Sequence, residues 1–229
     1  YELSLGLVGS EMCIRDSTLP LPPPQTEEEI LRDAERLLGA NVNLDSRPSF
    51  ISAGLSRNFV PSMVPMIATR GEFLTSYTPY QPEVSQGMLQ AMWEFQTMIS
   101  ELVGLPISNV SMYDASTSAA EAITCAVRVK SKKVEMPNTV YVSELIPPHR
   151  MSVIENYTQG VGIDIRKIPH DEDGFLDLNL ASEASGSCAI YVEQPNAFGI
   201  LDEGLLKLRE VVGDNTAIIV GVDVTSLGI

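Results

Sequence analysis

The strongest constraint on the fold is a regular alternation of apolar strand-like runs and helical patterns in the second half of the chain. Strand, helix and strand repeated in this way are typical of a mainly parallel sheet with helices on both faces. The predicted strands are TVYVS (139–143), GIDIRKI (162–168), SCAIYVEQ (187–194) and residues 216–224, and helices are predicted over residues 147–159 and 202–212. The sequence therefore predicts an α/β fold.

Two helices are predicted in the first half of the chain from their start and stop residues. Thr26 and Glu29 have the spacing of a capping box, ahead of a short amphipathic helix that ends at Gly39. A longer helix is predicted over residues 88–103, where apolar residues step by three and four and a glycine follows. Between them, residues 59–87 contain the run EFLTSYTPYQPEVSQG, which we expect to be a rigid extended loop because proline fixes φ and removes donors.

The segment that leads into the predicted sheet contains a short strand candidate and a helix start. NVSMYD (109–114) is predicted as a short strand. Ser118 and Glu121 have capping-box spacing, which predicts a helix of small apolar residues from there to about Val129.

The two ends of the chain differ in character from its middle. Residues 1–17 have no helical or strand period and resemble a translated sequencing adapter, so we expect a non-native or disordered extension. Residues 18–87 are expected to form an N-terminal arm with the short helix and the extended loop, and residues 88–229 a partial α/β domain. The apolar run TAIIVGVDV near the end lacks a closing helix, so we expect a C-terminally truncated fragment.

The composition excludes several classes of protein. The 15 basic and 30 acidic residues give a formal charge of −15, which argues against nucleic acid or an anionic membrane as partner, and every apolar run is too short for a membrane span. Cys13, Cys125 and Cys188 lack metal-site spacing, so a reducing, cytoplasmic location is expected, with Cys125 and Cys188 as inert core residues. His149 and His170 are expected to be surface residues rather than catalytic or metal-ligating ones.

Ligands of such sheets collect at the carboxyl ends of the strands, where the loop 112–122 holds several polar residues. Ser116 and Thr117 crowd a helix start, which suits an anion such as phosphate. Ordinary N-capping is the alternative, and it is favoured because Asp114 would repel a phosphate.

Two further loops at the same edge carry polar side chains. In residues 191–200, the amides of Gln194 and Asn196 have the chemistry to bind a carboxylate or a ring oxygen, or the Pro-Asn pair simply makes a turn. In residues 221–228, Asp223 ends a very apolar strand, where a carboxylate needs a cationic ring nitrogen, an arginine or water as partner.

Residues 73–123 carry a string specific enough to indicate a family, with the core YTPYQPEVSQG at Tyr77–Gly87. This string resembles the P-protein of the glycine cleavage system, the decarboxylating glycine dehydrogenase, and in particular its N-terminal half or separate subunit 1. The resemblance runs from about Leu21 to Ile229 and includes QPNAFGILDE and VDVTSLGI.

The resemblance implies an aminotransferase-like large domain of the pyridoxal-phosphate (PLP) fold type I and a role as an enzyme subunit. The whole enzyme uses PLP to decarboxylate glycine and transfers the aminomethyl group to the lipoyl arm of the H-protein. In the two-subunit form the PLP-binding lysine belongs to subunit 2, so PLP is expected on that partner and not covalently on this chain. A lysine of this kind is expected beyond Asp223, so the fragment alone is expected to be inactive. The earlier lysines, at helix ends or in charged surface runs, are Lys130, Lys132, Lys133, Lys167 and Lys207.

The resemblance also implies roles for individual residues. Tyr77, Tyr80 and Gln81 match the interface segment that reaches the partner's cofactor or glycine; alternatively, the two tyrosines only pack the subunit interface. The positions that match a cofactor site in catalytic relatives, and that would be its remnant here, are Ser116, Thr117, Gln194, Asn196 and Asp223.

Two other functions stay open beside that of a glycine decarboxylase subunit. One is a self-sufficient PLP enzyme whose lysine lies outside this sequence. The other is a non-catalytic scaffold that stabilises its partner. Full length, fusion of the two subunits and the quaternary count do not follow from the sequence.

Overall fold

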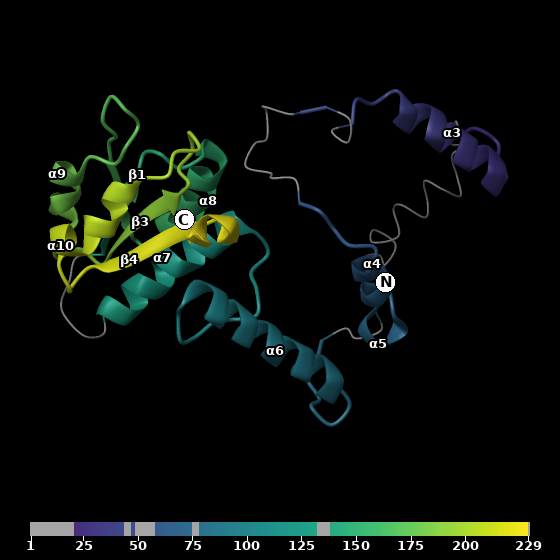
Figure 1. Ribbon diagram of the computed structural model, residues 1–229, viewed down its shortest axis with the longest axis horizontal. Helices are drawn as coiled ribbons and strands as arrows, with labels where there is room; N and C mark the ends of the chain where they lie inside the picture. The colour runs from purple at the N-terminus through teal and green to yellow at the C-terminus, as the bar shows by residue number, and fades with distance from the viewer. Residues whose placement is uncertain (1–20, 44–46, 49–57, 75–77, 132–137, 229) are drawn as a thin grey trace, which may run out of the picture. The chain divides into compact units, whose positions relative to one another are not determined.

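The structure, a computed structural model, describes residues 21–43, 47–48, 58–74, 78–131 and 138–228. The chain divides into two units, one up to Ala53 and the other from Gly54 onward. Of the described segments, the first unit contains one helix, and the second contains three more helices and an α/β sheet domain (Figure 1). Residues 1–17 lie outside the described residues.

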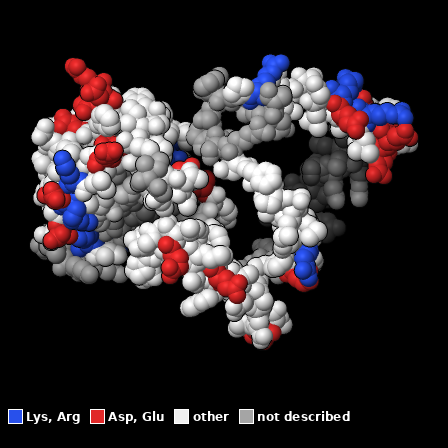
Figure 2. Space-filling model, in the orientation of Figure 1, with Lys and Arg blue, Asp and Glu red and all other residues white. Residues whose placement is uncertain are grey.

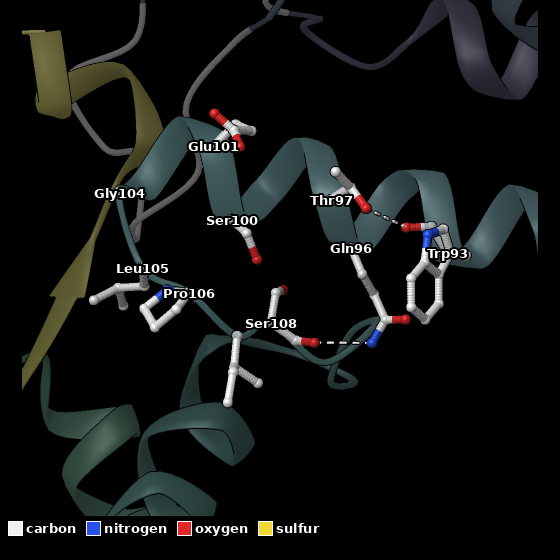
Figure 3. A pocket seen from close by; sticks show the side chains of 10 residues that line it. Trp93, Gln96, Thr97, Ser100, Glu101, Gly104, Leu105, Pro106 and Ser108 are labelled. Carbon is white, nitrogen blue, oxygen red and sulfur yellow. Dashed lines mark hydrogen bonds between the residues drawn. The ribbon is translucent and has the colours of Figure 1, made fainter.

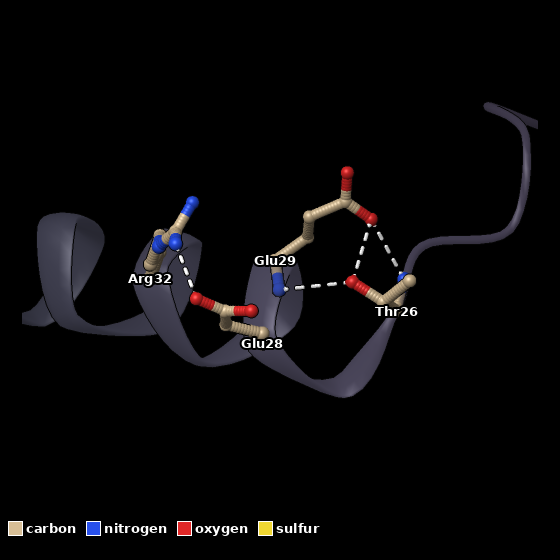
Figure 4. A network of polar contacts seen from close by, with 4 residues as sticks. All are labelled: Thr26, Glu28, Glu29 and Arg32. Atoms are coloured by element: carbon tan, nitrogen blue, oxygen red, sulfur yellow. Dashed lines mark hydrogen bonds and ion pairs between the residues drawn. The ribbon is translucent and has the colours of Figure 1, made fainter.

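Helix α3 (Glu27–Gly39) begins with the predicted capping box. The Thr26 hydroxyl accepts from the backbone N–H of Glu29 at 3.4 Å, and the Glu29 carboxylate accepts from the backbone N–H of Thr26 at 2.8 Å (Figure 4). An ion pair between Arg32 and Glu28 follows one turn later. Figure 2 shows the visible face of α3 crowded with charges of both signs, while its isoleucine and three leucines are all more than half exposed. The helix therefore has local stabilisation but no core of its own.

The sequence predicted an extended loop over residues 59–87, and the structure shows that this is only partly correct. Two short helices, α4 (Met63–Ala68) and α5 (Gly71–Leu74), interrupt them. Pro65 does not prevent α4 because it lies in the first turn, where a backbone N–H has no intrahelical acceptor. Residues 78–85 are non-helical, with a turn at 82–84, and they fit the expected loop.

Helix α6 (Gln86–Val103) is the long amphipathic helix that the sequence predicted. Gly104 ends it in the left-handed conformation with φ +68°, and its N–H donates to the Ser100 carbonyl. No residue of α6 is buried.

The sheet has four parallel strands in the order β2-β1-β3-β4. The strands are β1 (Thr139–Ser143), β2 (Asp164–Ile168), β3 (Ala189–Gln194) and β4 (Ala217–Val222). Helices α7 (Ala115–Ser131) and α8 (Pro148–Gln159) pack on one face, and the other face carries α9 (Leu178–Ala181), η1 (Ser182–Ala184), η2 (Glu203–Lys207) and α10 (Leu208–Val212). A final short 3₁₀ helix, η3 (Val224–Gly228), follows β4. The predicted parallel sheet with helices on both faces is confirmed.

Each face of the sheet has its own core because successive side chains of a strand point to opposite faces. On the α7–α8 face, Val140 and Val142 of β1 pack with Ile123 of α7. On the other face, Ile190 of β3 packs with Leu208 of α10. All five are buried, which explains why the strands read as continuous apolar runs.

Three local predictions are wrong. Residues 109–114 form no strand, since no described strand lies alongside to pair with them. Helix α7 begins at Ala115 rather than at Ser118, because Asp114 supplies the cap. Cys125 is exposed rather than a core residue: it follows the buried Ile123 by two positions, about 200° around the helix. Cys188 is buried as expected, and this burial raises the pKa of its thiol.

None of the helices among the described residues is both long and apolar enough to span a membrane.

Candidate functional site at the carboxyl edge of the sheet

The connectivity of the sheet produces a topological switch point between the neighbouring strands β1 and β3. The chain leaves β1 through α8 on one face to reach β2, whereas it leaves β3 through η2 and α10 on the opposite face to reach β4. Strand order reverses at such a point, and ligands of open α/β sheets bind in the crevice outside the carboxyl ends there.

A buried polar network lies beside this crevice on the α7–α8 face. Glu193, the penultimate residue of β3, accepts with Oε1 from Arg150 Nη1 at 2.5 Å and from the Tyr191 hydroxyl at 2.9 Å. The side chains of Arg150 and Glu193 are only 16% and 6% exposed. Arg150 lies in the first turn of α8, so the ion pair joins the segment after β1 to the end of β3.

The network explains the ionisation of its members. Burial works against the charge of Arg150, but its hydrogen bond and charge interaction with Glu193 outweigh this effect and raise the guanidinium pKa. Burial, followed by the neighbouring Glu193 carboxylate, also raises the pKa of Tyr191. Gly221 of β4 lies against the same group, since a Cβ there would meet the Tyr191 hydroxyl oxygen at 2.6 Å.

The start of α7 is capped by its own side chains. Asp114 Oδ1 accepts from the Thr117 N–H at 2.7 Å, and the Thr117 hydroxyl donates to the Asp114 carbonyl at 3.1 Å. The Thr117 N–H does most to lower the pKa of the exposed Asp114, and the charge of Arg150 contributes further. Ser116 is half-buried in the same first turn. The helix N-terminus thus already carries a carboxylate.

The loop after β3 uses both of its predicted site amides for its own structure. Gln194 Oε1 accepts from the Asp202 N–H at 2.9 Å. Asn196 Oδ1 accepts from the N–H groups of Phe198 and Ile200, and its Nδ2 donates to the Gly174 carbonyl at 2.9 Å. These bonds account for the turn that the sequence offered as the alternative to ligand binding.

Asp223 does not need the cationic partner that the sequence had suggested for it. Its carboxylate is exposed and accepts from the hydroxyl and N–H of Thr225 at 2.6 and 2.9 Å, which lowers its pKa. The apolar strand ends at Val222, one residue before the carboxylate, and hydrogen bonds rather than an ion pair stabilise the charge.

The two histidines are exposed, as predicted. His149 lies on the first turn of α8. His170 follows β2 and lies 3.8 Å from a Glu144 oxygen, with its ring edge-on to Phe198. Among the described residues no group of His, Cys, Asp or Glu has the arrangement of a metal site.

The interface residues predicted from the sequence belong to the segment that precedes α6 in the chain. Tyr77 is outside the described residues. Tyr80 is 84% exposed and Gln81 is exposed, both on the non-helical segment that precedes α6.

A hollow of about 580 Å³ lies between the last turns of α6 and the segment that follows it (Figure 3). The Gln96 side chain closes one side by donating to the Ser108 carbonyl at 2.8 Å, next to the largely exposed Trp93. Glu101 is the one ionisable side chain among its ten lining residues. The hollow thus lacks the paired acid and base or the charged cluster that chemistry would need.

One known protein family matches almost the whole chain. The family described as "Glycine cleavage system P-protein" matches residues 10–229. The chain belongs to this family. The prediction made from the string at residues 73–123 is therefore confirmed.

Individual relatives agree with the family. "Probable glycine dehydrogenase (decarboxylating) subunit 1" of Thermococcus kodakarensis is 42% identical over 211 residues, which cover 91% of this chain and 46% of the relative. The crystal structure of glycine decarboxylase (P-protein) of the glycine cleavage system, in inhibitor-bound form, matches with a TM-score of 0.77 and 35% identity over 93% of this chain and 46% of that one. This P-protein segment thus spans about half the length of the curated relatives it matches.

A more distant structure extends the likeness of the fold alone. Mouse CSAD in apo form matches with a TM-score of 0.54 at 14% identity, over 92% of this chain and 47% of that one. The predicted fold class, the aminotransferase-like fold of PLP enzymes of fold type I, is confirmed.

Three residues of the polar network were not predicted from the sequence: Arg150, Tyr191 and Glu193. The available signal was a glutamate inside the apolar strand AIYVEQ, because a carboxylate in a buried strand requires a cation close by. The sequence did not indicate which cation this would be.

Proposed function

We propose that the chain acts as subunit 1 of a glycine decarboxylase, the P-protein of the glycine cleavage system, working in the cytoplasm with subunit 2 and the lipoylated H-protein. The observation that carries this proposal is 42% identity to a relative named as subunit 1, over 91% of the chain. The substrate would be glycine, whose decarboxylation the complete enzyme couples to aminomethyl transfer.

We further propose that PLP is held by subunit 2 and not at this chain's own crevice. The residues here do not fit a phosphate, because the Thr117 N–H is already bonded to the Asp114 carboxylate and Arg150 is engaged by Glu193. Two lysines follow α7 among the described residues, Lys167 and Lys207, and neither supplies an attachment point for PLP. Both are exposed, and Lys167 also pairs with Glu155. On this proposal Ser116, Thr117, Gln194, Asn196 and Asp223 are the remnant of a cofactor site.

Tyr77, Tyr80 and Gln81 are proposed to reach the cofactor or glycine of the partner. The high exposure of Tyr80 supports this role, because a tyrosine that is solvated in one chain is available to a second one. The hydroxyl and the amide would orient the substrate by hydrogen bonds, and the prolines beside them limit the motion of the loop.

The test is reconstitution of the complete subunit 1 with subunit 2, with glycine-dependent release of carbon dioxide as the readout. We expect Tyr80→Phe and Gln81→Ala to lower turnover about tenfold or more if the groups contact the reacting molecule. Tyr157→Phe, a partly exposed tyrosine on α8, is the matched control and should retain activity. Unchanged turnover in both variants would leave only the scaffold function.

The location of PLP has a separate test. Borohydride reduction of the assembled complex should fix PLP on subunit 2 alone, as found by mass spectrometry. A labelled lysine on subunit 1 would instead support the self-sufficient PLP enzyme.

A further inference from the structure

We propose that Arg150 is a positioning residue for this reaction: through Glu193 and Tyr191 it fixes the first turn of α8 against the end of β3, on the two sides of the crevice. The proposal rests on the proposed function, because it concerns the geometry that the subunit offers to its partner.

The ion pair joins the elements on either side of the switch point. Arg150 belongs to α8, the helix that follows β1, and Glu193 is the penultimate residue of strand β3. These are the two strands whose connections diverge, so the Arg150–Glu193 bond spans the switch point. A second link crosses the same point, where the Ala197 N–H donates to the Leu145 carbonyl at 2.8 Å.

Stability alone does not account for the network. A buried ion pair loses hydration on both sides, and apolar residues of similar volume often serve the fold equally well. In addition, Arg150 Nε is buried without a hydrogen-bond partner in the described part of the chain, which is a cost to folding. What the pair provides is a fixed direction, because a guanidinium held by a carboxylate has a defined geometry.

The same side-chain types occur elsewhere in the sheet and supply a control. On β2, Arg166 Nε bonds Asp164 Oδ2 at 2.9 Å, and its Nη1 bonds the Tyr141 hydroxyl at 3.4 Å. The charged pair of this group is on the surface, with the Arg166 and Asp164 side chains each 57% exposed, although Tyr141 itself is buried. The group joins the neighbouring strands β1 and β2, which α8 connects along one face of the sheet. If any group of an arginine, an acid and a tyrosine contributed to activity simply by stabilising the sheet, substitutions in the two groups would lower activity equally.

The experiment uses the complete subunit 1 assembled with subunit 2 and measures kcat and KM for glycine in carbon dioxide release. Arg150→Met and Glu193→Gln should each lower kcat about tenfold or more, while KM changes less than about threefold because the proposed role of the pair is to position backbone rather than to bind substrate. Arg150→Lys, which keeps the charge but loses the planar fork, should recover part of kcat. Arg166→Met and Asp164→Asn should leave both parameters near wild type.

The double variant Arg150→Met with Glu193→Gln separates positioning from folding. Removing both charges should restore the unfolding midpoint toward wild type, because no unpaired buried charge remains, yet kcat should stay low. Recovery of kcat together with stability, or equal effects of Arg150→Met and Arg166→Met, would overturn the proposal.

The controls distinguish this proposal from the one on which it rests. A wild-type complex without glycine-dependent release of carbon dioxide would refute the proposed function, and the positioning role with it. A wild-type complex that is active while the Arg150 variants match it would refute the positioning role alone.

Discussion

Replacing Gly221 by alanine should destabilise the sheet domain specifically through the Tyr191 hydroxyl. A Cβ at this position would lie 2.6 Å from that oxygen and 3.2 Å from Glu193 Cγ, and both distances are shorter than normal contacts. The hydroxyl must then move and weaken its 2.9 Å bond to the Glu193 carboxylate. Overpacking of this kind costs about 1–3 kcal/mol. Alanine also restricts the unfolded chain, which offsets about 0.4–1 kcal/mol, so we expect a net loss centred at about 1.3 kcal/mol.

The double-mutant cycle with Tyr191→Phe tests this cause. Without the hydroxyl the nearest atom of residue 191 is its ring carbon, 3.4 Å from the new Cβ, which is an ordinary contact. Gly221→Ala should therefore cost about 1 kcal/mol less in the Tyr191→Phe background than in wild type.

The assay is urea unfolding of the complete subunit, followed by far-ultraviolet circular dichroism, with all four proteins compared at equal m-values. Ser187→Ala is the control for an unrelated hydrogen bond, since the Ser187 hydroxyl donates to the Ala184 carbonyl just before β3. The losses of unfolding free energy caused by Ser187→Ala and Gly221→Ala should be additive. Strict additivity between Gly221→Ala and Tyr191→Phe would refute the explanation given for the glycine.

Three shorter predictions concern other parts of the chain. The pKa of Asp114 is lowered from 3.8, so its bonds stabilise the folded state above that pH and are lost as pH falls through the lower folded pKa; the unfolding midpoints of wild type and Asp114→Asn should thus converge as the pH falls below 3.8. Midpoints that stay equally separated at pH 3 would contradict this. Thr26→Ala should remove about 1 kcal/mol of capping energy and thereby lower the helicity of a peptide that spans α3. Unchanged circular dichroism would count against the capping box. A thiol reagent should label Cys125 before unfolding and Cys188 only after it, as located by mass spectrometry, and early labelling of Cys188 would contradict its burial.

The sequence predicted the elements of the sheet domain well because their signals are local. Runs such as TVYVS are apolar, β-branched and bounded by turn residues, and β1 occupies residues 139–143 as predicted. Helix ends were similarly predictable, since the capping box at Thr26 and the left-handed Gly104 act within one turn. The strand prediction for residues 109–114 was wrong because a strand also needs a neighbouring strand to pair with, which a local sequence pattern does not reveal.

The candidate site divides in the same way. Residues at strand ends, such as Asn196 and Asp223, could be named from the sequence, because a parallel sheet places its carboxyl ends at one edge. Their hydrogen-bond partners could not be predicted from the sequence. Each side chain accepts from a backbone N–H two residues away, and whether such a bond forms depends on the geometry of the loop. The capping of α7 by Asp114 is a case where the competing local bond prevailed.

By itself the sequence determined the family and the order of strands and helices, because both follow from patterns contiguous along the chain. The tertiary structure alone decided that Arg150 would meet Glu193, 43 positions later in the chain, and that Cys125 would face outward. Such contacts depend on which face each helix covers and on the register between strands. Those are settled only when the apolar faces of the whole domain are buried together.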